Sequence, residues 1–164
     1  MKQFALFFLV LISLQANEAQ QKDLNGLVSQ MSGAFIWEMT KPASQTMIRK
    51  GERTSEPYFE GQLFMFRETF FDSKIEQVGF FGYDTKEKQV LSVGLYNVDM
   101  GPHILKGTPE KLDKGYLVTF FEKDKKIVLH IENREHHFWK YYSKNGDQWM
   151  VDDLQIDFYR NPKE

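Results

Sequence analysis

Short runs of aromatic and β-branched residues alternate with polar residues along most of the chain, and Gly, Pro, Asn and Asp separate the runs. Apolar residues at every second position, bounded by turn-forming residues, are typical of β-strands with one buried face. The pattern predicts ten strands, at residues 34–40, 46–52, 58–71, 75–83, 89–98, 104–107, 116–122, 126–133, 137–142 and 148–159.

These strands are joined by short polar turns, which indicates an antiparallel meander. An open sheet has two unpaired edges, and closure into a barrel removes both. We therefore expect an all-β fold, an antiparallel up-and-down barrel, with a sandwich as the alternative. A barrel of eight or more strands is wide enough to hold a small ligand, so the pattern also predicts an interior cavity.

The segment before the first strand has a helical pattern. Four apolar residues fall at positions i, i+3, i+4 and i+7, namely Leu24, Leu27, Val28 and Met31. Asp23 is placed to cap this helix and Gly33 to end it. A helix of this length is marginal alone, so we expect it to lie on an apolar surface.

The N-terminal residues 1–19 have the pattern of a secretory signal peptide. Lys2 precedes an apolar run at residues 4–14, and the small residues Ala16 and Ala19 lead into a polar segment. We expect cleavage after Ala19, with Ala16 as second choice; an uncleaved anchor and a buried first strand are the alternatives. Residues 20–164 then form one exported domain, periplasmic or secreted, that is not embedded in the membrane after cleavage.

Composition limits the function further. The chain has 164 residues, and 21 Lys and Arg nearly balance 23 Asp and Glu, so no overall positive field draws it to nucleic acid. It has no cysteine, which excludes disulfides, thiolate metal sites and a cysteine nucleophile. Its 15 Phe, 7 Tyr and 3 Trp are more than a small core needs, and this excess fits a wide barrel with flat apolar walls.

The dipeptide Asn145-Gly146 is the strongest turn signal, because both residues tolerate the positive φ of a type I′ hairpin. If they form the loop, Tyr142 lies opposite Trp149 and Trp139 opposite Asp152. Side chains alternate between faces, and the more aliphatic set is expected to face the core: His137, Trp139, Tyr141, Met150, Asp152, Leu154, Ile156, Phe158 and Arg160.

That assignment places His137, Asp152 and Arg160 among apolar side chains, where a charge needs a partner, water or a cavity. The alternative is a β-bulge at Asp152-Asp153 that turns Asp152 outward and brings Trp149 and Val151 inward. The pattern leaves both open.

Three short motifs carry a resemblance to a known superfamily. A short helix leads into Gly33 and Trp37, Gly82-Tyr83-Asp84 stands at a strand end, and Phe158-Tyr159-Arg160 closes the last strand. In these features the chain resembles the calycins, which include lipocalins and fatty-acid-binding proteins, and more closely an uncharacterised bacterial family of exported lipocalin-like domains of unknown function. The resemblance implies a calycin-like barrel in which Trp37 packs against Arg160 and closes the base.

Sequence motifs for phosphate binding and for a serine nucleophile elbow are absent. His136 and His137 are adjacent, so on a strand they point to opposite faces and cannot chelate one ion. A haem-binding barrel needs an inward histidine, and the hairpin places His137 alone there. We expect no metal and no cofactor.

Three hypotheses for function remain. In the first, the barrel binds a small apolar or amphipathic molecule, with Trp139 and Tyr141 as wall and polar contacts from His137, Asp152 and Arg67 or Glu68. One of the last two points inward, because they lie between Phe66 and Phe70. In the second, Asp152 and His137 are the acid and base of an enzyme of unknown reaction. In the third, the interior is packed and the exposed Tyr142 and Trp149 contact a protein. Whether the protein is an enzyme, and its oligomeric state, stay open.

Overall fold

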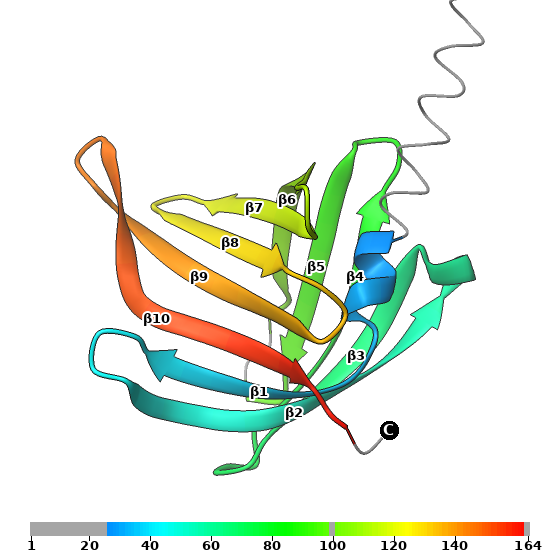
Figure 1. Cartoon of the computed structure of the whole chain (residues 1–164), viewed down its shortest axis with the longest axis horizontal. Helices are drawn as coiled ribbons and strands as arrows, with labels where there is room; N and C mark the ends of the chain where they lie inside the picture. The colour runs from blue at the N-terminus through cyan, green and yellow to red at the C-terminus, as the bar shows by residue number, and fades with distance from the viewer. Residues whose placement is uncertain (1–25, 99–100, 163–164) are drawn as a thin grey trace, which may run out of the picture.

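The computed structural model describes residues 26–98 and 101–162, so the predicted signal peptide at residues 1–19 lies outside the described residues. Ten antiparallel strands close into an up-and-down barrel in which each pairs with its neighbours in sequence and β1 pairs with β10 (Figure 1). The predicted barrel is confirmed, and the sandwich is wrong. The strands are β1 (Gly33–Lys41), β2 (Thr46–Tyr58), β3 (Leu63–Phe70), β4 (Glu76–Asp84), β5 (Gln89–Tyr96), β6 (His103–Lys111), β7 (Tyr116–Glu122), β8 (Lys125–Ile131), β9 (His136–Asn145) and β10 (Gln148–Arg160).

Two strands run through positions that the sequence marks as breaks. Pro57 pairs with Phe64 inside the β2–β3 ladder, and Pro109 pairs with Val118 between β6 and β7. Proline lacks a donor, but its fixed φ lies in the extended region, so the flanking residues continue the pairing. The break between β2 and β3 comes later, at the 3₁₀ turn η1 (Phe59–Gly61).

The described part of the N-terminal helix, residues 26–31, lies at one end of the barrel (Figure 1). Leu27, Val28 and Met31 are fully buried in the same core cluster as Tyr116 and Ile131. The expectation that this helix lies on an apolar surface is therefore confirmed, whereas its expected cap and first apolar residue lie outside the described residues.

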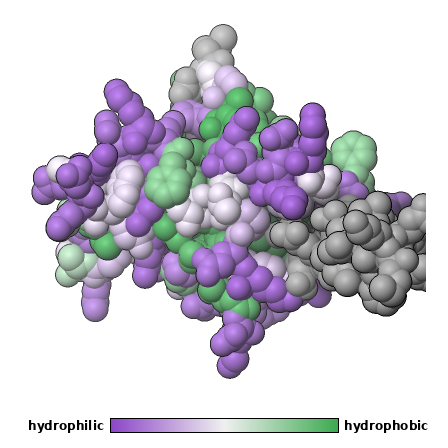
Figure 2. All heavy atoms as spheres, turned by 90° about the horizontal axis from the view of Figure 1, so that it is seen from above, coloured by the Kyte–Doolittle hydropathy of each residue, from purple (hydrophilic) through white to green (hydrophobic). Residues whose placement is uncertain are grey.

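Aromatic pairs fill the core of the barrel. Phe64 stacks on Phe81, with ring centroids 5.3 Å apart, and Phe120 stacks on Trp139 at 5.5 Å. The outer surface keeps the polar half of the alternation: the face in Figure 2 is mostly hydrophilic, with apolar side chains between. Period-two alternation thus separates core from surface.

The predicted register of the β9–β10 hairpin is wrong. Asn145 pairs with Gln148, so Gly146 and Asp147 form the loop, and Gly146 alone of that pair has a positive φ, 61°. A second shift follows between Val151 and Gln155. Both shifts move the pairing by two residues, which changes partners but not faces.

The irregular stretch of β10 includes the expected bulge position, Asp152-Asp153, but it leaves Val151 66% exposed. Trp149 packs against the exposed Phe121 on the outer face. The bulge alternative was therefore right about the place of the irregularity and wrong about the inward turn of Trp149 and Val151.

The base of the barrel differs from the arrangement that the calycin resemblance implies. The register pairs Arg160 with Phe35 and Trp37 with Phe158. Accordingly, the Arg160 guanidinium lies over the Phe35 ring, 5.2 Å from its centroid, and donates a hydrogen bond of 2.8 Å to the carbonyl oxygen of Ser32. Phe35 thus takes the place expected for Trp37 beneath the guanidinium.

Trp37 lies two residues further along β1 than Phe35, on the same inner face, and is 2% exposed. Its indole covers Gly51 on β2, where a Cβ atom would come within 2.4 Å of the ring and 2.0 Å of the Thr69 carbonyl oxygen. The ring of Phe70 meets it edge-on at 4.7 Å. Gly51 thereby lets the indole lie flat against the strand and form one wall of the interior.

Candidate functional site

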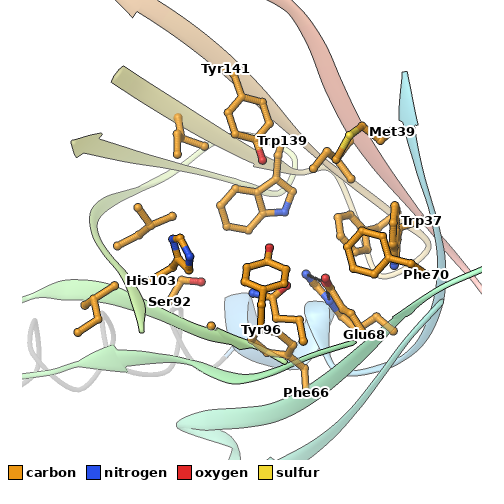
Figure 3. Close-up of a pocket in the computed structure, with 18 of the residues that line it drawn as sticks. Trp37, Met39, Phe66, Glu68, Phe70, Ser92, Tyr96, His103, Trp139 and Tyr141 are labelled. Atoms are coloured by element: carbon orange, nitrogen blue, oxygen red, sulfur yellow. Dashed lines mark hydrogen bonds and ion pairs between the residues drawn. The ribbon is translucent and has the colours of Figure 1, made fainter. Parts of the chain in front are cut away.

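A cavity of about 260 Å³ occupies the barrel toward the end opposite the helix (Figure 3). This volume exceeds the roughly 150 Å³ of an apolar protein cavity that accommodates benzene. The strands contribute these lining residues: Trp37, Met39, Arg53, Phe66, Glu68, Phe70, Gln77, Ser92, Gly94, Tyr96, His103, Ile104, Leu105, Glu122, Ile127, Trp139, Tyr141, Ile156 and Phe158.

Aromatic rings form much of the wall, and packing holds them in place. Trp139 is fixed from behind by its stacking on Phe120, with the two ring planes 15° apart. Trp37 is held between Gly51 and the edge of Phe70. Flat, immobilised rings present a large apolar area at little cost in side-chain entropy, which suits a ring-shaped ligand.

A buried ion pair between Arg53 and Glu68 lies in the cavity wall. The two residues are direct partners across β2 and β3, and they are 6% and 7% exposed. Arg53 Nε donates to Glu68 Oε1 at 2.6 Å, and Arg53 Nη2 contacts the same oxygen. The guanidinium also lies over the ring of Phe158, 4.0 Å from its centroid. Paired in this way, the two charges add no net charge to the cavity.

Two tyrosine hydroxyls point into the cavity, one from Tyr96 on β5 and the other from Tyr141 on β9 (Figure 3). Neither hydroxyl has a hydrogen-bond partner among the described residues. Burial raises the pKa of Tyr141, and the neighbouring Tyr96 and Glu68 raise it further. Burial also raises the pKa of Tyr96, with a contribution from Glu68. Both hydroxyls therefore stay protonated and neutral, and each can donate and accept a hydrogen bond.

Three of the residues that the sequence proposed for the site line this cavity, namely Glu68, Trp139 and Tyr141. Of the Arg67-Glu68 pair, Glu68 is the inward residue. Arg67 lies on the outer surface, where it forms an exposed ion pair with Glu76. Arg67 is therefore not a lining residue.

His137 is inside the barrel but not in the cavity wall. It is fully buried between the rings of Phe35 and Phe158, whose centroids lie 4.8 and 4.7 Å from its own. Neither ring nitrogen has a hydrogen-bond partner among the described residues. Burial lowers the pKa of His137 well below its ordinary value, and the positive charge of Arg53 lowers it further, so the imidazole is neutral.

Pairing of β10 with β1 begins at Gln155, and Asp152 lies in the part of β10 before this residue. The β9–β10 hairpin reaches beyond the rest of the barrel there (Figure 1). The carboxylate of Asp152 accepts a hydrogen bond of 3.0 Å from the Ser143 hydroxyl. His137 pairs with Phe158 further along the hairpin, so the structure does not bring Asp152 and His137 together.

Arg53 and Tyr96 are site residues that sequence reasoning missed. Arg53 follows several other charged residues in β2, so its inward direction gives no local signal. A signal exists on the partner strand: Phe66, Glu68 and Phe70 alternate, which turns Glu68 inward and requires a buried cation nearby. The identity of that cation follows only from the β2–β3 register.

No group of three or more His, Asp or Glu side chains within residues 26–98 and 101–162 is placed to hold a metal ion. In the same part of the chain, no helix has the length and apolar character needed to cross a membrane. No protein-family model matches the chain. Comparison with curated proteins finds no significant relative.

The burial of His137 makes stability depend on pH. Above the ordinary pKa of 6.5 the folded and unfolded chains are both neutral at this residue. As pH falls below that value, the unfolded chain takes up a proton that the folded chain does not, so the free energy of unfolding falls by up to about 1.4 kcal/mol per pH unit. Replacing His137 by Phe is expected to remove this slope and to add about 1–2 kcal/mol at neutral pH, because two unpartnered buried nitrogens are lost.

Urea unfolding of the wild-type protein and of His137→Phe at several pH values from neutral to about pH 5 measures both effects. Equal pH slopes in the two proteins would contradict the assignment of the pH dependence to His137.

Proposed function

We propose that this protein is an exported, calycin-like barrel that binds a small apolar or amphipathic molecule in its interior. The single observation that supports this function best is the cavity of about 260 Å³ between immobilised aromatic walls. Protein interiors are close-packed and contain few voids larger than a water molecule. A space of this size beside well-stacked pairs such as Phe120–Trp139 is what a binding protein requires.

The proposed location, periplasmic or secreted, is supported by the signal-peptide pattern of residues 1–19. The predicted single domain, residues 20–164, then carries the binding function.

The other two hypotheses have less support. Asp152 and His137 lie apart, so an acid–base pair made of these two residues is not formed. A packed interior does not fit the cavity. The outer face does carry an aromatic cluster in which the Lys126 ammonium lies 4.1 Å from the Tyr142 ring centroid and Phe121 meets Trp149. This cluster favours a protein-contact role, which is compatible with ligand binding.

The binding function can be tested with 1-aminonaphthalene, a dye of two fused rings that is uncharged at neutral pH and whose emission changes in apolar surroundings. We expect saturable binding of one dye per chain, and binding weaker by about 10-fold or more in Ser92→Phe, because the added ring fills the cavity. Leu95→Phe is the matched control, since Leu95 lies on the same strand with 43% of its surface exposed. Equal affinities of the wild type and Ser92→Phe would place the dye elsewhere and contradict the proposal.

A further inference from the structure

The charges that line the cavity constrain the charge of its ligand. Among the described lining residues, Arg53 and Glu68 are the buried charged ones, whereas His103 and Glu122 are exposed. Arg53 directs both of its contacting nitrogens at one oxygen of Glu68. The guanidinium is therefore already neutralised and is not a free site for an anion.

An anionic ligand would have to compete with Glu68 for Arg53 and would bring a second negative charge close to the buried Glu68 carboxylate. A cationic ligand would have to compete with Arg53 for Glu68 and would be repelled by the Arg53 guanidinium. Burial of an uncompensated charge is strongly unfavourable in either case. The buried pair thus penalises ions of both signs and leaves neutral molecules unaffected.

Apart from the exposed His103 and Glu122, the other polar side chains of the lining are neutral and able to bond a ligand. The hydroxyls of Tyr96 and Tyr141 face the cavity and have no hydrogen-bond partner among the described residues (Figure 3). The Ser92 side chain also lines the cavity, and its hydroxyl makes no hydrogen bond within the described chain. A hydroxyl or carbonyl group on a ligand would satisfy these groups.

The shape of the cavity favours rings over long chains. Trp37, Phe70 and Trp139 give flat walls from three different strands (Figure 3). The volume of about 260 Å³ is less than twice that of the benzene-sized cavity of roughly 150 Å³. One ring or two fused rings therefore fit, and stacking on the walls adds to the burial of their area.

Resting on the binding function proposed above, we infer that the ligand is an uncharged molecule of one or two aromatic rings with a hydroxyl or carbonyl group. The Arg53–Glu68 pair is the element that excludes charged analogues, and the Tyr96 and Tyr141 hydroxyls bind the polar group.

Three probes with one ring system separate charge from shape: 2-naphthol, 2-naphthoate and 2-naphthylmethylammonium. Isothermal titration calorimetry at neutral pH is expected to show 2-naphthol binding about 10-fold or more tightly than either ion. Naphthoate or the ammonium compound binding as tightly as 2-naphthol would overturn the inference. If the fluorescent dye binds and an ion is preferred, only the inference fails; if neither the dye nor any naphthalene probe binds, the proposed function fails as well.

Variants assign the selectivity to residues. Glu68→Gln removes the negative charge but keeps an oxygen for Arg53, and it is expected to strengthen 2-naphthoate binding by about 10-fold or more. Glu76→Gln is the matched control, because Glu76 is the partner of Arg67 in an ion pair on the outer surface. This variant is expected to leave the affinities for 2-naphthol and 2-naphthoate unchanged. Unchanged selectivity in a folded Glu68→Gln would contradict the role of the pair.

Should Glu68→Gln fail to fold, the double variant Tyr96→Phe, Tyr141→Phe keeps the inference testable. It is expected to weaken 2-naphthol binding by about 5- to 10-fold and to leave the binding of naphthalene, which has no hydroxyl, unchanged. Equal losses for naphthalene and 2-naphthol would show that the two hydroxyls do not bind the polar group.

Discussion

Replacement of Glu68 by Leu is expected to lower the free energy of unfolding by about 3–5 kcal/mol, because it leaves the Arg53 guanidinium buried without a counter-charge. Arginine cannot lose its proton in a protein, so the charge stays. With Arg53 only 6% exposed, water compensates it poorly. Urea unfolding followed by circular dichroism measures the loss.

Three related variants identify the cause of this loss. Arg53→Met is expected to cost less than Glu68→Leu, since an unpaired Glu68 can take up a proton and become neutral. The double variant Arg53→Met, Glu68→Leu is expected to be more stable than Glu68→Leu alone, because no charge is left in the core. Glu76→Leu, which breaks the exposed pair with Arg67, is expected to cost at most about 1 kcal/mol. Additive losses in the double variant would rule out the pair as their source.

The second large effect is expected at Phe120. Its replacement by Ala removes a fully buried ring that supports Trp139, and truncations of this kind cost about 3–5 kcal/mol. The neighbouring Phe121 is 63% exposed, so Phe121→Ala is expected to change stability by about 0.5 kcal/mol or less.

Thermal and urea unfolding of these two adjacent variants test the alternation on which the barrel depends. Similar losses at Phe120 and Phe121 would mean that β7 (Tyr116–Glu122) does not have one inner and one outer face. Phe120→Ala also enlarges the space behind Trp139. The dye affinity of this variant therefore shows whether the cavity wall depends on the stacking of Phe120 on Trp139.

Local patterning was enough to predict most of the fold. The strand at residues 116–122 was predicted with the observed bounds, because β-branched and aromatic residues fill it and polar turns flank it. The buried face of the helix, with Leu27 and Met31, follows from spacing alone. Both patterns are local, and each specifies which side of an element is apolar.

The β9–β10 hairpin marks the limit of such patterns. Asn145-Gly146 is a strong turn signal, yet the loop is Gly146-Asp147. A shift of two residues keeps every side chain on its face, so hydrophobic patterning cannot distinguish the two registers. Pairing with the other neighbours, β8 and β1, selects between them. The same shifts leave Asp152 in the projecting part of the hairpin and away from His137.

Alternation along single strands predicted the all-β fold, placed Trp139 and Tyr141 in the interior, and left either Arg67 or Glu68 as the inward residue. Which residues meet there is a different matter. Arg53 reaches Glu68, and Tyr96 approaches Tyr141, only through strand pairing across the closed barrel. A strand's pattern specifies the side on which a residue lies, whereas partners, cavity volume and charge balance depend on register and closure, which are properties of all ten strands together.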